Sequence, residues 1–255
     1  MAAAKLLPRA GFAAVLLAAL FLTGCGKSAP YLRSETEARR DVRKEVKEDV
    51  TYAVDVYDPF EGWNRGVYRF NYRFDKYLFL PVANTYGFLM PDVAEKGVHN
   101  ALKNIGEVNN FVNSTLQFKP EAILTAFWRF VINSTIGLAG LFDVATPFGI
   151  PEWKEDFGQT LGWYGVGNGP YLVLPIFGPS NLRDGIGLVG DAGINSYTDP
   201  FNLLTDDEYA LPYTALTAVD KRRSTAFRYY ATGSPFEYEL VRMLYTDVRK
   251  VEISK

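Results

Sequence analysis

The sequence predicts an all-α fold, and three observations support this prediction. Apolar residues recur every three or four positions over several long segments, which is the spacing of one face of a helix. Two of these segments follow Asp-Pro-x-Glu or Ser-Pro-x-Glu patterns, which are typical of helix starts. No stretch of the sequence shows sustained strand alternation, and Tyr171–Leu174 is the one short β-like run.

Residues 1–24 have the pattern of a lipoprotein signal peptide. Lys5 and Arg9 provide positive charge, and the apolar run 11–22 is shorter than the roughly 20 residues that span a bilayer. The run ends in Leu-Thr-Gly-Cys, which resembles the lipobox in which the cysteine, here Cys25, receives diacylglycerol. Cys25 is the single cysteine, so lipid attachment leaves no thiol for a disulfide. The alternative is an ordinary secretory signal with a chance cysteine.

The segment 25–57 is predicted to be a lipidated, charged tether. Two or more acyl chains hold a protein stably on a membrane. Gly26 stands where many inner-membrane lipoproteins carry aspartate, which favours the outer membrane. Residues 33–49 are dense in both signs of charge, so the segment is at best a solvated helix, and a spacer without chemistry is the simpler interpretation.

The predicted helical domain covers residues 58–255 and opens with a large aromatic face. Asp58 is the expected N-cap of the first helix, and Pro81 is expected to end it. One face of this helix carries Trp63, Val67, Phe70, Phe74 and Tyr77. We expect this face to be buried, against either the protein core or acyl chains.

Further helices are expected along the rest of the domain. Their approximate ranges are 91–105, 107–116, 120–136, 181–194, 212–230 and a last helix that begins at the capping pattern Ser234-Pro-Phe-Glu237. The helix 120–136 has almost no polar face, so it lies either in the centre of a core or against lipid. Ser180 is the expected cap of the helix 181–194.

Residues 137–180 combine many glycines and prolines with many large apolar side chains. This density of glycine and proline breaks long helices, while a polar linker would lack the apolar residues. Backbone outside helices cannot face hydrocarbon without hydrogen-bond partners. The segment is therefore expected to pack on the helices or to line a cavity.

The sequence argues against an enzyme. His99 is the single histidine, and no Gly-x-Ser-x-Gly elbow occurs in the chain. An ordinary helix-surface histidine is the simpler interpretation of His99. A metal site lacks histidine and cysteine ligands, and the acidic run 206–208 lacks EF-hand spacing. The net charge of −2 and the absence of a basic stripe argue against nucleic acid, and we expect no cofactor.

Several stretches together resemble the MlaA (VacJ) family of outer-membrane lipoproteins. They are Asp58-Pro-Phe-Glu-Gly-Trp-Asn-Arg65, Phe70-Asn71, Pro81-Val-Ala83, Asn133-Ser-Thr-Ile-Gly-Leu-Ala-Gly140 with Phe142-Asp143, Asp156-Phe-Gly-Gln-Thr-Leu-Gly-Trp-Tyr-Gly-Val-Gly-Asn-Gly-Pro170, and Leu174-Pro175 with Gly178 and Leu182-Arg-Asp184. The resemblance covers about 58–204, and its glycine-rich block is long and unusual.

The resemblance implies a fold and a function. The family forms a ring of helices partly embedded in the membrane, with a central amphipathic channel. It removes misplaced phospholipids from the outer leaflet of the outer membrane and passes them to a soluble periplasmic carrier. Members associate with trimeric porins, and this chain would be lipid-anchored on the periplasmic side. The alternative is a structural, porin-associated lipoprotein without a transport role.

The resemblance and the residue pattern together suggest channel or gating residues. They are Phe70, Asn71, Gly137, Gly140, Asp143, Gly158, Gly162 and Gly165. Glycines of this segment are expected to hold positive φ or to let backbones touch, and the alternative is that they only terminate helices. For Asn71 the channel wall and an interhelical hydrogen bond in the core are equally good interpretations.

The lipobox generates the first testable prediction. We expect Cys25→Ser to leave the protein unlipidated, because serine offers no thiol for the acyl chains. Fractionation of cells should show the variant lost from the outer-membrane fraction, with the wild-type protein as the control. Normal fractionation of the variant would contradict the lipobox assignment.

Overall fold

A computed structural model describes residues 56–255, so the signal peptide, Cys25 and almost all of the predicted tether lie outside the described residues. The described chain is mostly helical. Its helices are α3 (Glu61–Phe74), the π-helix η2 (Asp75–Phe79), α4 (Leu80–Leu89), α5 (Asp92–Leu116), α6 (Pro120–Thr135), α7 (Phe157–Trp163), α8 (Leu182–Thr198), α9 (Ala210–Ser224) and α10 (Glu237–Ile253). Within 56–255, no helix combines the length and apolar character needed to cross a membrane.

The one sheet of the described chain is a short antiparallel hairpin. It pairs β1 (Tyr171–Leu174) with β2 (Gly178–Asn181), with Tyr171 opposite Asn181 and Leu174 opposite Gly178. The β-like run that the sequence predicts is therefore a strand. The partner strand β2 begins with glycine and proline, so it shows no alternation of apolar and polar residues by which the sequence could have predicted it.

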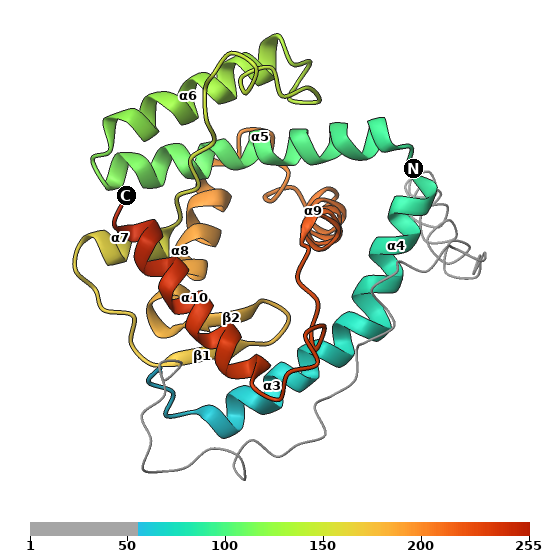
Figure 1. The fold of residues 1–255 in the computed structure, drawn as a ribbon. Coiled ribbons are helices and arrows are strands. Elements are labelled where there is room, and N and C mark those ends of the chain that lie inside the picture. The colour runs from blue at the N-terminus through green and yellow to red at the C-terminus, as the bar shows by residue number, and fades with distance from the viewer. Residues whose placement is uncertain (1–55) are drawn as a thin grey trace, which may run out of the picture.

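The helices form three groups (Figure 1). The elements α3, η2 and α4 follow one another as a continuous rod, and α9 packs on α4. The helices α5 and α6 form a second group and pack along one another. The third group contains α7, α8 and α10 together with the hairpin, and α5 contacts both α7 and α8. The glycine-rich segment is thus divided between a loop after α6, the short helix α7 and the hairpin.

Both predicted capping patterns are wrong, because their acidic residues bind elsewhere. The helix α3 begins at Glu61 without a side-chain cap, and Asp58 instead accepts a bond from Arg242 at 3.1 Å. Likewise α10 has no side-chain cap, and Glu237 accepts the Tyr68 hydroxyl at 2.8 Å. Tertiary partners at these two positions outweigh the local caps.

The ends of several other elements also differ from the prediction. Pro81 does not end the first helix, because it lies in the first turn of α4, where the missing N–H is tolerated. The ranges 91–105 and 107–116 form one helix, α5, which continues through Gly106. The cap of α8 is Asn181 rather than Ser180, and its side chain accepts the N–H of Asp184 at 2.8 Å.

Most of the aromatic face of α3 is not buried in the protein core, which was one of its two predicted environments. Trp63, Phe70 and Tyr77 are 69%, 49% and 73% exposed. The buried side of α3 instead carries Asn64, Val67, Tyr68, Asn71 and Tyr72. The pattern is general, since buried polar and charged residues outnumber buried apolar residues over 56–255. This arrangement is the reverse of an ordinary water-soluble fold.

The apolar core that exists is small and rich in tyrosine. It consists of Val67, Tyr68, Tyr171, Val173 and Tyr238, contributed by α3, β1 and α10. The Tyr68 ring meets the ring of Tyr238 edge to face, with centroids 5.7 Å apart. Burial, together with the negative charge of Glu237, raises the pKa of Tyr68 far above its usual range. The hydroxyl therefore stays protonated and donates to that carboxylate.

Asn64 attaches the hairpin to α3. Its side chain is fully buried, accepts the N–H of Val173 at 2.8 Å and donates to the carbonyl of Tyr171 at 3.0 Å. The same amide donates to Asp58 at 2.7 Å. One side chain therefore pairs with β1 in the manner of a neighbouring strand, and it connects the strand to the chain that precedes α3.

We expect Asn64→Ala to lower the free energy of unfolding by about 2–6 kcal/mol. The substitution leaves a backbone N–H and a carbonyl of β1 buried without partners, at about 1–3 kcal/mol each. Denaturant unfolding in neutral detergent, followed by circular dichroism, measures the change. Asn84→Ala is the control, because Asn84 is exposed on α4 and should change stability by less than about 0.5 kcal/mol. Equal effects of the two substitutions would contradict this role of Asn64.

Candidate functional site

Arg129 organises the loop that follows α6. Its side chain is 2% exposed, and its Nε donates to Glu107 of α5 at 2.6 Å. Its Nη1 donates to the carbonyl of Ile150 at 2.8 Å and to the hydroxyl of Thr146 at 3.1 Å. The guanidinium thus joins α5 and α6 to Thr146 and Ile150 of the loop. Removing one partner of such a buried pair costs about 3–5 kcal/mol.

Asp143, one of the predicted site residues, lies within this network. It accepts from Nη2 of Arg129 at 3.3 Å and from the hydroxyl of Thr146 at 2.6 Å. Although burial opposes ionisation, the bonds from Thr146 and the charge of Arg129 lower the pKa of Asp143. For Glu107, burial outweighs the bonds from Asn110 and Arg129 and raises the pKa. Asp143 therefore holds the loop in place by an ion pair.

Asn133 fixes the end of α6 to the same loop. Its buried side chain accepts the N–H groups of Val144 and Ala145 at 2.9 and 3.0 Å. Its amide donates to Asp143 at 3.3 Å. The polar side chains around Arg129 leave no room for a water molecule between them. This cluster is therefore a framework for the loop and not itself a binding pocket.

Gly137 and Gly140 hold positions that other residues cannot take. A Cβ on Gly137 would lie 2.2 Å from the carbonyl oxygen of Phe142. Gly140 has a φ of +87°, and a Cβ there would lie 2.8 Å from the Cβ of Asn104 on α5. Between them, Leu138 and Ala139 also have positive φ, which strains residues other than glycine. The expectation of positive φ and close backbone contact is confirmed for this turn.

The outer surface of α6 and of the loop is apolar. The exposed large side chains of this region are Leu124, Phe127, Trp128, Ile136, Leu138, Leu141, Phe142 and Phe148. The buried side of α6 carries Thr125, Arg129 and Asn133 beside two alanines. In a water-soluble protein the apolar side chains of such a helix would face inward and the polar ones outward. The reversed arrangement indicates a surface that contacts lipid or another protein.

A second buried framework surrounds Gly158 and Gly162 of α7. Arg249 of α10 donates to Asp184 of α8 at 2.8 Å and to Asp156 at 2.7 Å. A Cβ on Gly158 would lie 2.7 Å from the Asp184 carboxylate, and one on Gly162 would lie 2.7 Å from the end of Ile253. These two glycines permit the close approach of three helices.

Gly165 differs from the other glycines of the segment. Its φ is +85°, but nothing lies within 4 Å of the position of a Cβ. It forms the turn that ends α7, where its N–H bonds to the carbonyl of Gly162 at 2.9 Å. Here the interpretation that glycine terminates a helix is sufficient. The gating role proposed for the segment remains a prediction at every one of these positions.

Phe70 and Asn71 lie in different surroundings on α3. Phe70 is half-exposed and stacks on Phe74, with ring centroids 5.9 Å apart. Asn71 is buried, donates to the carbonyl of Leu174 at 2.9 Å and accepts the N–H of Ile176 at 2.8 Å. The partner of Asn71 is thus the hairpin turn, not another helix as one interpretation from sequence expected. Its place in a channel wall remains a prediction.

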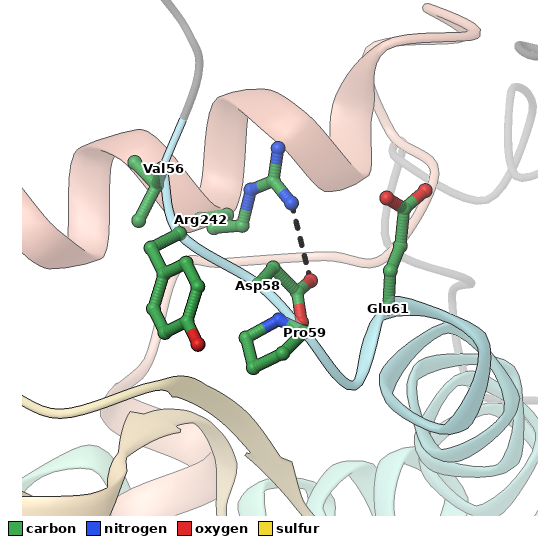
Figure 2. Close-up of a pocket in the computed structure, with 6 residues that line it drawn as sticks. Val56, Asp58, Pro59, Glu61 and Arg242 are labelled. Atoms are coloured by element: carbon green, nitrogen blue, oxygen red, sulfur yellow. Dashed lines mark hydrogen bonds and ion pairs between the residues drawn. The ribbon is translucent and has the colours of Figure 1, made fainter.

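A hollow lies where the chain enters α3 (Figure 2). It has a volume of about 420 Å³ and is open to one side. It is lined by Val56, Tyr57, Asp58, Pro59, Glu61 and Arg242. The charged residue at its base, Asp58, is already bonded to Arg242 and to the hydroxyl of Tyr238. The hollow therefore presents no free charged group of Asp58 to a ligand.

His99 joins α5 to α9. Its Nδ1 lies 2.9 Å from a carboxylate oxygen of Asp220. The neighbouring pair of Arg223 and Glu95, at 2.9 Å, connects the same two helices. His99 is thus a partner in a helix–helix contact, and residues 56–255 hold no cluster of potential metal ligands around it.

We expect Gly140→Ala to destabilise the protein more than Gly149→Ala. Both glycines have positive φ, which costs alanine about 1–2 kcal/mol. Only Gly140 faces a neighbour, Asn104, so overpacking adds about 1–3 kcal/mol there, whereas space is open at Gly149. Denaturant unfolding of both variants measures the difference. Equal stabilities would show that the contact between Gly140 and Asn104 is easily relaxed.

Comparison with known proteins places this architecture in one family. The family model described as MlaA lipoprotein matches residues 56–252. The intermembrane phospholipid transport system lipoprotein MlaA of Haemophilus influenzae is 32% identical over 212 residues, 81% of this chain and 75% of that protein. The protein of the same name from Escherichia coli K12 is 39% identical over 138 residues, 52% of this chain and 55% of the relative.

A solved structure from work on the structural basis for maintenance of bacterial outer membrane lipid asymmetry is similar throughout. It covers 78% of this chain and 100% of its own, with a TM-score of 0.60 and 28% identity. An uncharacterised protein of Rickettsia felis is 37% identical over 170 residues, and the match spans 66% of each chain. The family model covers nearly all of the described residues, and on this ground the chain belongs to the MlaA lipoprotein family.

Proposed function

We propose that this protein removes misplaced phospholipids from the outer leaflet of the outer membrane and passes them to a soluble periplasmic carrier. In this role it would be anchored through acyl chains on Cys25, on the periplasmic side. The names of the relatives describe an intermembrane phospholipid transport system, and the similar structure concerns outer-membrane lipid asymmetry. These names favour transport over the alternative of a porin-associated scaffold.

The observation that carries the proposal is the inverted distribution of polarity. Large apolar side chains of α3, α6 and the loop after α6 are exposed, while Arg129, Arg249 and their partners are buried. An apolar exterior suits contact with acyl chains, because burying it there removes it from water. The buried charged groups pair with one another and hold the helices together, which leaves the large apolar side chains for the exterior.

A ring with a central amphipathic channel fits the same observations. Figure 1 supports this proposal, since α3, α4, α5, α8 and α10 follow one another around the middle of the view and α9 lies inside their outline. The loop 137–150 is a candidate gate, because Gly137 and Gly140 set its shape and Arg129 holds its base. We propose trimeric porins as partners of the apolar exterior and the soluble carrier as the recipient of lipid.

Lipid movement through such a channel requires no covalent chemistry. The head group would pass from one polar environment to another, and the acyl chains would remain in hydrocarbon throughout. This division avoids the large cost of placing a charged phosphate in an apolar medium. Energy for net transport would come from elsewhere in the pathway, since this step follows the lipid gradient between leaflets.

Deleting the gene should raise the phospholipid in the outer leaflet of living cells. The measurement is the phospholipid accessible to an externally added phospholipase, with lipopolysaccharide release as a second readout. Wild-type protein should restore the low level, and Asn84→Ala, exposed on α4, is the control variant for expression. An unchanged outer leaflet together with fewer porin trimers would overturn transport and favour the scaffold.

A further inference from the structure

Among the described residues, polar contacts to other helices hold α9 near one end only. The side chains that make these contacts lie within residues 220–223, close to the C-terminal end of the helix. The pairs are Asp220 with His99 of α5 at 2.9 Å, Arg223 with Glu95 of α5 at 2.9 Å, and Arg222 with Asp75 of η2 at 2.7 Å. We call these three pairs the latch.

The surface of α4 leaves room for the latch. Gly87 has no side chain, and a Cβ there would lie 2.6 Å from the Nε of Arg223. Arg223 therefore passes close to α4 at this bare position on its way to Glu95. Asp220 and Asp75 are buried. Because removing one partner of a buried pair is strongly destabilising, this end of α9 is firmly fixed.

The rest of α9 has few contacts that fix its position. Asp220 is the one buried residue among the 15 of this helix. Leu211 is 77% exposed, and Thr214 is exposed as well. Loops at 199–209 and 225–236 connect the helix to α8 and α10. An element with so few buried contacts opens more readily than the helices around it.

The position of α9 gives such a movement a consequence. Figure 1 shows this helix nearly end-on, inside the outline of α3, α4, α5, α8 and α10. Its exposed part carries both apolar and polar side chains, among them Leu211, Thr214 and Leu216. A surface of this mixed kind can contact both the acyl chains and the head group of a phospholipid. A helix that only braced α4 against α5 would need buried contacts along its length, and α9 lacks them.

We propose that α9 is a movable gate, which pivots at the latch and blocks or clears the middle of the ring. The inference rests on the proposed function, which places a lipid passage there. Thr214 lies about 10 Å from Lys221 along the helix, because each residue adds about 1.5 Å. A tilt of about 30° at the latch would move Thr214 by about 5 Å and Lys221 hardly at all. The gate would be a second moving element beside the loop 137–150.

Distances between spin labels, measured by pulsed electron paramagnetic resonance, test the pivot in the full-length protein in neutral detergent. Cys25 is the single native cysteine, and lipid attachment would consume its thiol, so the labels attach to introduced cysteines. Glu121→Cys on α6 is combined with either Thr214→Cys or Lys221→Cys, and all three positions are exposed. We expect one narrow distance distribution for 121–221, and for 121–214 a distribution wider by about 5 Å. Equally narrow distributions would overturn the proposal.

Breaking the latch tests its role as the pivot. Asp220→Ala/Arg223→Ala removes both links to α5 and leaves the net charge unchanged. We expect the 121–221 distribution to become as wide as the 121–214 distribution. The matched control, Asp247→Ala/Lys250→Ala, removes an exposed pair at 3.1 Å on α10 and should leave both distributions as they are in the wild type. A narrow 121–221 distribution in the latch variant would refute the pivot.

Expression beside the wild type tests the gate in cells. Without its latch, α9 should let phospholipid move freely between the leaflets. Outer-leaflet phospholipid should then rise toward the level of the deletion strain even when wild-type protein is present, and the α10 control should cause no rise. If the two proteins reach equal levels in the outer membrane and the wild type restores the low phospholipid level, the latch variant is merely inactive and the gate is wrong.

The gate and the proposed function fail in different ways. A deletion strain with an unchanged outer leaflet would overturn the proposed function, whatever the spin labels show. A deletion strain with raised outer-leaflet phospholipid, together with a rigid α9, would overturn the gate alone.

Discussion

Every charged group inside this molecule must find its partner within the protein, and the fold depends on that constraint. Arg129 joins α5, α6 and the loop after α6, and Arg249 joins α7, α8 and α10. Most of the buried side chains are polar, so apolar burial alone cannot define how the helices pack. Hydrogen bonds require a defined geometry. They therefore specify one arrangement of the helices, whereas apolar contacts alone would allow several.

The same constraint explains how an apolar exterior is possible. A chain that places its polar groups inside leaves its large side chains for the surface, and α6 shows this on one helix, with Arg129 and Asn133 inside and Trp128 outside. The hairpin follows the same rule, because Asn64 and Asn71 satisfy backbone groups of β1 and of the turn after it. Both asparagines act as substitutes for a neighbouring strand.

The sequence predicts where helices occur better than it predicts which way they face. Periodic apolar residues locate α3, α5, α6 and α10, because the spacing is independent of the surroundings. For the aromatic face of α3 the sequence leaves the core and acyl chains as alternatives, and the structure turns most of that face away from the core, because spacing alone does not reveal which medium a face meets. The predicted caps at Asp58 and at Ser234–Glu237 are wrong because the carboxylates bond to residues distant in the sequence. Asp58 pairs with Arg242, and Glu237 accepts the hydroxyl of Tyr68. Arg129 was a usable signal, because an arginine in the middle of a nearly apolar helix indicates a buried partner.

The π-helix η2 is the place where the rod of α3, η2 and α4 accommodates an extra residue. Its hydrogen bonds span five residues, as from the N–H of Leu80 to the carbonyl of Asp75, so it holds one residue more than an α-helical turn would need. The wide turn absorbs that extra residue locally, so α3 and α4 keep nearly the phase they would have in an uninterrupted α-helix without it. Loss of one residue within 75–79 should therefore close the turn as an α-helix and leave Leu80 and Ala83 on the buried side. Loss of a residue elsewhere in the rod would instead turn everything after it by about 100°.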